Sequence, residues 1–460
     1  MATILTPAAP ADGVAGYGAH ARAVLVLGLP LIGSHLAQMA LHITDTVMLG
    51  WYSVEALAAL VLASTLWFTL FIFGTGFAWA VMPMVAHAAS SDDTTELRRV
   101  TRMGLWLSSG FAALAMPVMW WSDALLRALG QDAAISALAQ DYLRIAGWGL
   151  FPALLVMVLK SYLAALERTQ VVLWVTVAAA VLNVFVNWVL IFGNLGAPEM
   201  GVRGAAVASV VVAGATLAGL VLYAALLPAL RHHALFLRLW RPDWSAMGRV
   251  FRLGVPIGVT NLAEAGLFTA SSLLMGLIGT LELAAHGIAL QVISVIFMAH
   301  LGLSNAATVR AGRAVGRGDG PGLRRGAAVV AGLSMGFALV AVALCLLLPA
   351  TLVGLFLDPS DPVRPEVIAI GVAFLAVAAL FQLFDAAQVI ALGLLRGLQD
   401  TGVPMIFAAI SYWVVGVPLS WLLGFPLGMG GVGIWLGLVV GLALAALTMS
   451  VRFWRRAQAI

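Results

Sequence analysis

The chain has 460 residues, of which 62% are hydrophobic and only 10% are charged, and its formal net charge is +4. Soluble proteins carry about 25% charged residues, so this composition excludes a soluble, fibrous or disordered protein and predicts a chain embedded in a lipid bilayer. The small and scattered net charge argues against a nucleic-acid partner. A single cysteine, Cys345, excludes an intramolecular disulfide.

The first 21 residues are small and polar and lack a basic segment leading into an early apolar core. We therefore expect the first apolar span, and not a cleavable signal peptide, to direct membrane insertion. A transmembrane helix needs about 20 mainly apolar residues. Twelve segments meet this requirement: 24–48, 56–83, 100–121, 138–162, 170–193, 204–228, 250–276, 284–308, 326–354, 367–395, 403–425 and 430–453. Barrel strands would be shorter and alternate in polarity, so we predict an all-α membrane protein with twelve transmembrane helices.

The basic residues are distributed unevenly between the loops. With the N-terminus inside, 20 of the 24 basic residues fall on the inner side, and the other 4 are Arg127, Arg144, Arg203 and Arg364. This imbalance predicts that both termini are cytoplasmic. It also explains the basic loops 231–252 and 310–325 as determinants of topology rather than as binding sites for lipid or nucleic acid.

The two halves of the sequence resemble each other at a constant offset of 226 residues. At this offset Leu27-Gly28-Leu29-Pro30 matches Leu253-Gly254-Val255-Pro256, and Leu57-Ala58-Ala59 matches Leu283-Ala284-Ala285. Each half holds six spans, an even number, so both halves enter the membrane from the same side. We predict two pseudo-symmetric six-helix lobes, 1–228 and 250–460, joined by a cytoplasmic linker at 229–249 and surrounding a central cleft.

Three acidic residues, Asp45, Glu264 and Asp385, lie inside the apolar spans. A charge at the centre of a transmembrane helix costs roughly 2.5–3.5 kcal/mol on insertion scales, and we expect no Lys or Arg deep in a span to pair with them. The three carboxyl groups should therefore carry protons or bind a cation, as in a protein that exchanges ions. For Asp45 the alternative is a cap at the end of the first helix, because Gly50 follows closely.

Polar and aromatic residues share helix faces with these acids at spacings of three or four. His42 and Gln38 lie on the face of Asp45. The residues that we expect to support the acids are Gln38, Asn183, Asn187, Asn261, Phe381, Gln382 and Gln388. The Asn183 and Asn187 pair would equally suit structural hydrogen bonds between helices. No cluster of His, Cys and Asp has the spacing of a metal site.

The energy source should be an ion gradient. Lys160-Ser161 is not preceded by the glycines of a phosphate-binding loop, and the short loops leave no room for a nucleotide-binding domain. A membrane enzyme would need a nucleophile or a metal cluster near an interface, and the sequence offers neither. We therefore expect a transporter that is not an enzyme and that has no cofactor.

The sequence resembles the multidrug and toxic compound extrusion (MATE) family, in its NorM-like bacterial branch, over nearly the whole chain. The resemblance rests on the following segments: Ala37-Gln38 with Thr44-Asp45-Thr46-Val47-Met48-Leu49-Gly50, Leu182-Asn183 with Asn187-Trp188, Phe251-Arg252-Leu253-Gly254-Val255-Pro256 with Glu264, and Asp385-Ala386-Ala387-Gln388-Val389 with Leu395-Arg396-Gly397. It implies an antiporter of the bacterial inner membrane that exports cationic and lipophilic drugs by alternating access in exchange for H⁺ or Na⁺. The alternative is a lipid-linked oligosaccharide flippase, which would need a cationic cavity.

The same resemblance implies roles for individual residues. Glu264 and Asp385 would form a cation site in the C-terminal lobe, where Na⁺ could bind transiently, and Asp45 would anchor a proton-linked cluster with the two asparagines in the N-terminal lobe. It also implies a bend of the first helix near Pro30. Close relatives carry a tyrosine where this chain has Phe381, and the lost hydroxyl favours H⁺ as the coupling ion. We expect a monomer in the bilayer.

Overall fold

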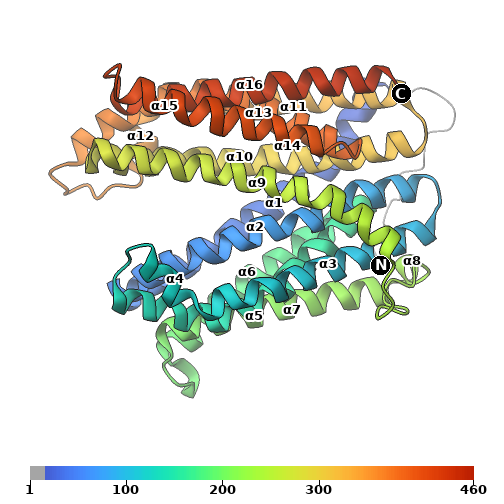
Figure 1. Ribbon diagram of the computed structural model, residues 1–460, viewed down its shortest axis with the longest axis horizontal. Helices are drawn as coiled ribbons and strands as arrows, with labels where there is room; N and C mark the ends of the chain where they lie inside the picture. Colours follow the sequence, from blue (N-terminus) through green and yellow to red (C-terminus); the bar gives the residue numbers. More distant parts are fainter. Residues whose placement is uncertain (1–15) are drawn as a thin grey trace.

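The computed structural model describes residues 16–460, and all regular secondary structure in this part of the chain is helical. Twelve of its helices are long and apolar enough to cross a membrane, which confirms the predicted number of spans and the all-α fold class. The long helices run side by side along the longest axis of the molecule (Figure 1). The protein is therefore a multi-pass membrane protein.

Twelve spans and a few short connecting helices follow one another along the chain. The N-terminal spans are α1 (Tyr17–Tyr52), α2 (Val54–Ser90), α3 (Thr94–Trp120), α5 (Ala133–Ala165), α6 (Thr169–Phe192) and α7 (Gly201–Leu226). The C-terminal spans are α9 (Trp244–Ile278), α10 (Thr280–Gly316), α11 (Gly320–Leu347), α13 (Arg364–Gly397), the composite span α14 (Gly402–Ala409), η2 (Ile410–Gly416) and α15 (Val417–Gly424), and α16 (Gly430–Gln458). Short helical segments connect them: α4 (Ser122–Ala128), η1 (Asn194–Gly196), α8 (Pro228–Arg231) and α12 (Pro349–Gly354).

Side-chain caps define where several of these helices begin. Asp93, Asp132, Asp243 and Asp319 each accept a hydrogen bond from a backbone N–H in the first turn of the helix that follows, and Ser53 does the same for α2. Such caps satisfy donors that have no partner inside the helix. The chain can therefore turn sharply between consecutive spans.

Two helix boundaries differ from the expected ones. We expected the ninth span to continue to residue 354, but α11 ends at Leu347 and Pro349 opens the separate helix α12, since proline cannot continue a helix. We expected the linker to extend to residue 249, but α9 already begins at Trp244, so residues 244–249 are helical. The cap provided by Asp243 sets this earlier start.

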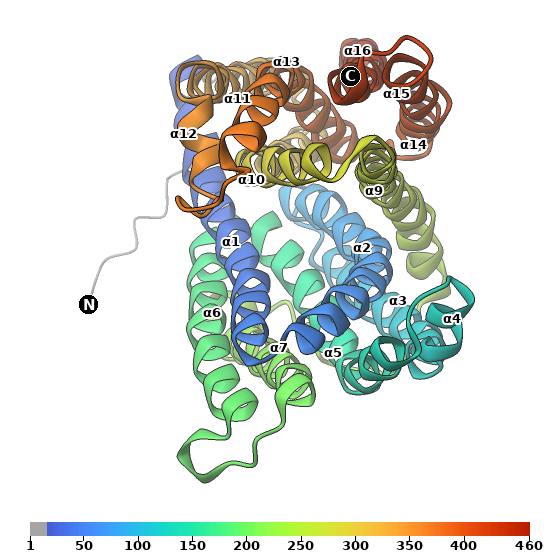
Figure 2. The ribbon, with the colours of Figure 1, turned by 90° about the vertical axis from the view of Figure 1, so that its left-hand side faces the viewer.

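The buried side chains form two large clusters, one drawn mainly from residues 27–257 and the other mainly from residues 267–457. Figure 2 shows the corresponding helices as two groups, α1 to α7 and α9 to α16. These two groups of helices are the two lobes of the predicted fold.

We call the end of the bundle where α1 begins and α16 ends the terminal end, and the opposite end the far end (Figure 1).

The two lobes pack against each other in the halves of their helices nearest the terminal end. A β-carbon on Gly76 of α2 would collide with the backbone of Gly254 and Gly258 in α9, and a β-carbon on Gly302 of α10 would collide with Ile32 of α1. Glycine thus permits backbones of the two lobes to approach closely. The interface is consequently tight at this end.

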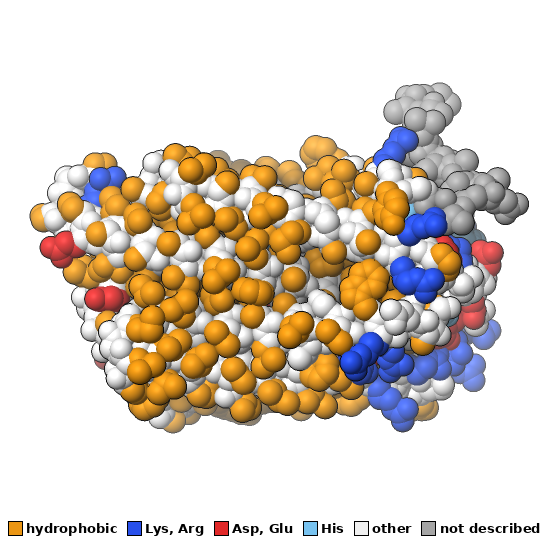
Figure 3. Space-filling model, turned by 90° about the horizontal axis from the view of Figure 1, so that it is seen from above, with side chains coloured by type: hydrophobic (Ala, Val, Ile, Leu, Met, Phe, Trp, Pro, Cys, Tyr) orange, Lys and Arg blue, Asp and Glu red, His pale blue; other side chains and the backbone are white. Residues whose placement is uncertain are grey.

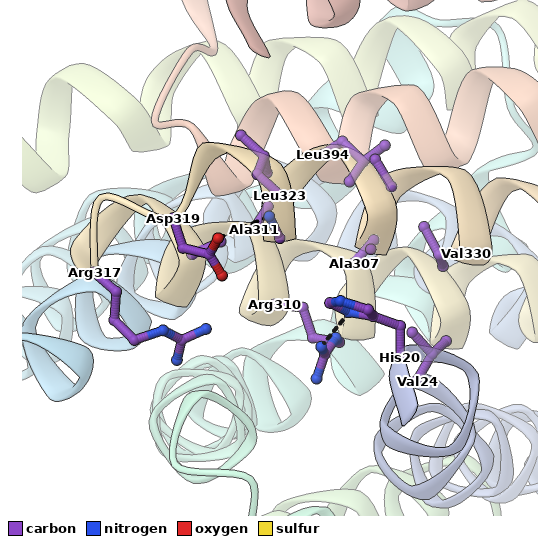
Figure 4. A pocket seen from close by; sticks show the side chains of 14 residues that line it. His20, Val24, Ala307, Arg310, Ala311, Arg317, Asp319, Leu323, Val330 and Leu394 are labelled. Atoms are coloured by element: carbon purple, nitrogen blue, oxygen red, sulfur yellow. Dashed lines mark hydrogen bonds between the residues drawn. The ribbon is translucent and has the colours of Figure 1, made fainter. Parts of the chain in front are cut away.

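Polar contacts between the lobes also gather at the terminal end. Nδ1 of His20 in α1 accepts a hydrogen bond of 2.8 Å from Nη2 of Arg310 in α10 (Figure 4). Nη1 of Arg313 lies 2.8 Å from a carboxylate oxygen of Glu167. Among residues 16–460, the hydrogen bonds that join helices of one lobe to those of the other all lie in this half of the bundle. The lobes are therefore closed against each other at the terminal end.

Positive charge gathers at the same end. In Figure 3, most of the visible Lys and Arg side chains lie at the terminal end, and the surface between the two ends is dominated by hydrophobic side chains. An apolar belt bounded by charged ends is the surface expected of a protein that spans a bilayer.

Candidate functional site

The first candidate cluster joins α1 to α6 within the N-terminal lobe. Oδ1 of Asp45 accepts hydrogen bonds from Nδ2 of Asn183 at 3.1 Å and from Nδ2 of Asn187 at 2.6 Å. The two asparagines lie one turn apart on one face of α6 and are buried, and Asp45 is half-buried. Residues separated by 138 and 142 positions in the sequence are thus brought together by the pairing of two helices.

The capping alternative for Asp45 is wrong. Its carboxylate binds the neighbouring helix, and α1 continues beyond it to Tyr52. Both amide donors are aimed at one carboxylate oxygen, and hydrogen bonds to a charged acceptor are stronger than bonds between neutral groups. The cluster therefore holds a carboxylate whose protonation would weaken two hydrogen bonds.

Gln38 and His42 form no hydrogen bond with this cluster. Both lie on the face of α1 that carries Asp45, but within residues 16–460 neither side chain forms a hydrogen bond. Gln38 is half-buried and His42 is exposed. Their assignment to the site stays a prediction.

The second candidate cluster lies between α9 and α13 in the C-terminal lobe. The rings of Phe268 and Phe381 meet edge to face, with centroids 6.0 Å apart. Glu264 lies one turn before Phe268 and Asp385 lies one turn after Phe381. Since α9 runs away from the terminal end and α13 runs towards it (Figure 1), both acids lie on the same side of the aromatic pair. The acids are thus placed at one level of the bundle.

Burial and charge set the properties of this second cluster. Asp385 is only 2% exposed, and Oε1 of Glu264 is buried without a hydrogen-bond partner in residues 16–460. None of the ion pairs in that range includes Glu264, Asp385 or Asp45. The acids of both clusters therefore lack a direct cationic partner from this part of the chain.

Arg396 brings a buried positive charge close to this second cluster. Arg396 is only 5% exposed, donates from Nη2 to Oδ1 of Asn261 at 2.8 Å, and stacks 4.9 Å above the ring of Trp79 in the other lobe. Lys160 is also buried, at 9% exposure. Asn261 lies one turn before Glu264. Because Arg396 is bound to Asn261, its positive charge lies near the acids although it forms no ion pair with them.

The amides of α13 complete the second cluster. Gln382 is fully buried, and neither of its polar side-chain atoms has a partner within residues 16–460. Gln388 donates from Nε2 to the hydroxyl of Tyr412 at 2.8 Å. Buried polar groups are normally hydrogen-bonded, so these amides are suited to contact a polar guest. Phe381 is 1% exposed and packs on Trp435 at 5.9 Å, which makes it an apolar wall.

Sequence reasoning missed Arg396 and Tyr412 as members of the cluster. Arg396 stands at the end of an apolar run, a position typical of a basic residue in a loop that determines topology. Tyr412 lies in the π-helical segment η2, and its signal was a polar ring inside an otherwise apolar span. Segments of π-helix often occur at functional positions.

The described residues 16–460 contain no group of three or more His, Cys, Asp and Glu that could hold a metal ion. The carboxyl pair of the C-terminal lobe offers fewer ligands of this kind than a resident metal requires. It is chemically suited to protons or to a cation that binds and leaves.

The sequence of this chain matches a known protein family. Residues 30–189 and 256–422 of this chain match the MatE family. The two matched segments begin 226 residues apart (256 minus 30), which is the offset of the internal repeat. Each half of the chain thus corresponds to one copy of the family's unit.

Relatives match almost the whole chain. It is 50% identical over 436 residues to the "Probable multidrug resistance protein NorM" of Rhizobium meliloti, covering 95% of this chain and 93% of that protein. It is 46% identical over 442 residues to the protein of the same name in Agrobacterium fabrum, covering 96% and 95%.

Solved structures share the fold. One, described as the outward-facing conformation of a multidrug resistance MATE family transporter, gives a TM-score of 0.87 at 19% identity and covers 96% of both chains. Another, a MATE in complex with MaL6, gives a TM-score of 0.87 at 18% identity and covers 96% of this chain and 97% of the other.

Proposed function

Because this chain belongs to the MatE family, we propose that it is a multidrug efflux transporter that exports cationic and lipophilic compounds in exchange for H⁺ or Na⁺. Two relatives that cover nearly the whole chain carry the name of multidrug resistance proteins. The two lobes and the buried acids supply the parts that such exchange needs. The membrane is the bacterial inner membrane, with both termini in the cytoplasm.

The observation that carries this proposal is the charge balance of the C-terminal cluster. It contains the carboxyl groups of Glu264 and Asp385 and the guanidinium of Arg396, and neither of these two carboxyl groups forms an ion pair within residues 16–460. With both acids ionised, the cluster carries one net negative charge. One proton or one monovalent cation neutralises it, and a neutral cluster is favoured in a low-dielectric interior.

Because either a cationic drug or a proton can neutralise the acids, the binding of one excludes the binding of the other. A cationic drug that neutralises the acids leaves no charge for a proton, and a proton that arrives first removes the attraction for the drug. Exchange then follows if the site opens alternately to the two sides of the membrane. The inward gradient of the ion supplies about 2.3 kcal/mol for each charge that crosses 100 mV.

We propose H⁺ as the principal coupling ion. A sodium ion prefers several oxygen ligands, as hard cations do, and Phe381 supplies a ring where a tyrosine would supply a hydroxyl. A proton needs only one carboxylate oxygen. In the N-terminal lobe, Asp45 with its two amide donors offers a further carboxylate that can take up a proton.

The bundle is closed at its terminal end. The lobes contact each other through His20, Arg310 and the glycines of the terminal end. If the terminal end faces the cytoplasm, the bundle is closed on the inner side. The acids would then receive protons from the outside and release the exported compound there.

Dye efflux from proteoliposomes tests this function. We expect Glu264→Gln and Asp385→Asn each to reduce ethidium efflux driven by a pH gradient at least ten-fold, because an amide cannot exchange a proton for a cation. Asp358→Asn removes an equally charged group from the exposed loop before α13 and should keep the wild-type rate. Wild-type efflux in both Glu264→Gln and Asp385→Asn would refute the scheme.

Separate gradients identify the ion. A pH gradient alone should drive efflux, and a Na⁺ gradient alone should drive it weakly or not at all. The flippase alternative requires a cationic cavity, whereas this cluster has two carboxyl groups for one guanidinium. Ethidium efflux in a pH gradient would therefore also separate the two functions.

A further inference from the structure

An open groove lies between α1 and α6 near the terminal end. Its volume is about 660 Å³, and it is lined by Arg22, Leu25, Val26, Leu29 and Pro30 of α1 and by Gln170 and Leu173 of α6. Leu25, Val26 and Leu29 are all exposed. The groove contains none of the acids of the two candidate clusters, so the proposed transport does not account for it.

A tight contact between the helices closes the deep end of the groove. The hydroxyl groups of Ser34 and Thr176 lie 3.0 Å apart and are both buried. One residue earlier, Gly33 faces Leu173 so closely that a β-carbon there would collide with the leucine side chain. The two helices therefore touch towards the middle of the bundle, and the groove extends from this contact towards the terminal end.

The groove is polar at its mouth and apolar inside. Arg22 stands in the second turn of α1 and Gln170 in the first turn of α6, at the level where positive charge gathers, and both are exposed. Val26 and Leu29 follow Arg22 on the same face of α1 at spacings of four and seven residues. At 1.5 Å per residue, the apolar wall extends about 10 Å from Arg22 into the membrane.

We propose that this groove binds an anionic glycerophospholipid of the leaflet at the terminal end. Arg22 and the amide of Gln170 would hold the phosphate of the headgroup, since a guanidinium presents a planar fork of donors that matches phosphate oxygens. One acyl chain would lie along Leu25, Leu29 and Leu173. Burial of this exposed apolar surface by the chain adds to the attraction of the headgroup.

Other occupants fit the groove less well. A free phosphate ion would leave the apolar wall unused. A cationic drug would be repelled by Arg22, which takes part in no ion pair among residues 16–460. A phospholipid with a negative headgroup matches both the charge at the mouth and the apolar interior.

The position of the lipid has a structural consequence. The two helices that form the groove are those that hold Asp45 against Asn183 and Asn187. A bound lipid would brace this helix pair at the end opposite to the acid cluster. The lipid site itself does not depend on whether the acids exchange protons.

Native mass spectrometry of the full-length protein, delipidated in detergent, tests the proposal with phosphatidylglycerol as the probe and phosphatidylethanolamine as the comparison. A single Arg near an anionic lipid contributes about 1 kcal/mol, so we expect Arg22→Gln to weaken phosphatidylglycerol binding about five-fold. Arg22→Lys should stay within two-fold of the wild type. Arg455→Gln removes the same charge from the exposed end of α16 and should not change binding.

A second variant tests the apolar wall. Leu29→Trp places a larger side chain in the groove and should reduce the binding of phosphatidylglycerol without removing a charge. Unchanged binding in both Arg22→Gln and Leu29→Trp would refute the site, and so would equal losses in Arg22→Gln and Arg455→Gln. Displacement of the lipid by ethidium would assign the groove to drugs instead. Loss of efflux in the acid variants is a separate readout, so failure of one proposal leaves the other testable.

Discussion

At the scale of single residues, the environment of each acid decides what it can exchange. Asp45 accepts hydrogen bonds from two asparagine amides of another helix. Glu264 and Asp385 accept no hydrogen bond from a side chain within residues 16–460. The positive group near them is Arg396, whose guanidinium donates to Asn261 and lies over the ring of Trp79. The two clusters therefore hold carboxyl groups of different character, and the C-terminal one depends on a single guanidinium.

Arg396→Gln should change the pH dependence of transport. Without the guanidinium, no positive charge offsets that of the ionised Glu264 and Asp385, so they should retain protons at higher pH. The midpoint of the efflux rate against pH should therefore rise by about one unit, equivalent to about 1.4 kcal/mol. Arg396→Lys keeps the charge and should keep the midpoint, although it loses the planar contact with Trp79. Efflux from proteoliposomes over a range of pH measures the midpoint. A lower rate with an unchanged midpoint would show that Arg396 acts only through packing.

At the scale of elements, the start of α9 depends on one side chain. Oδ1 of Asp243 accepts a hydrogen bond of 3.0 Å from the N–H of Ala246 and a bond of 3.1 Å from Nη2 of Arg99, and its other oxygen accepts from Nε of the same arginine. The guanidinium of Arg99 lowers the pKa of Asp243 to about 2. A cap on α9 is thus tied to α3 in the N-terminal lobe.

Asp243→Asn should keep the cap and lose the ion pair, whereas Asp243→Ala loses both. A lost cap costs about 1 kcal/mol and a lost bond between charged groups about 1.5–3 kcal/mol, so the alanine variant should unfold at the lower temperature. The folded-state pKa lies below the usual value of about 3.9, so this stabilisation is present above that pH and is lost as the pH falls towards 2. Thermal unfolding in detergent between pH 7 and pH 3 measures it. Equal melting temperatures of the two variants would show that the ion pair and not the cap stabilises the helix.

At the scale of the whole molecule, the sequence predicted those features of the fold that depend on composition and periodicity. Apolar length identifies twelve spans, and the repeat at offset 226 identifies two lobes. The buried position of Arg396 could not be predicted, because it depends on how α13 packs against α9 and α2. Gln38 shares a helix face with Asp45, but the sequence does not show that the asparagines of α6, and not Gln38, reach the carboxylate.

The contact between the lobes at the terminal end should respond to pH through His20. Its Nδ1 accepts from Arg310, and since an arginine can only donate, the bond requires a neutral imidazole. Arg317 and Asp319 line the same small cavity of about 20 Å³ (Figure 4). Protonation of His20 would remove the acceptor and set two positive charges side by side. Asp319 would offset them in part, whereas Arg317 and Arg325 add to the positive charge around His20. Acid should therefore favour separation of the lobes at this end.

Spin labels on Ser91→Cys in the N-terminal lobe and Arg455→Cys in the C-terminal lobe, in a Cys345→Ala background, report the distance across the terminal end. Between pH 8 and pH 5.5 we expect the wild-type histidine to shift the population towards longer distances, by up to about ten-fold for a bond of about 1.5 kcal/mol. His20→Gln supplies an amide oxygen that accepts from Arg310 at any pH, so this variant should keep the short distance throughout. If it opened as much as the wild type, the response would belong to other titrating groups, and the buried acids would be the first to examine.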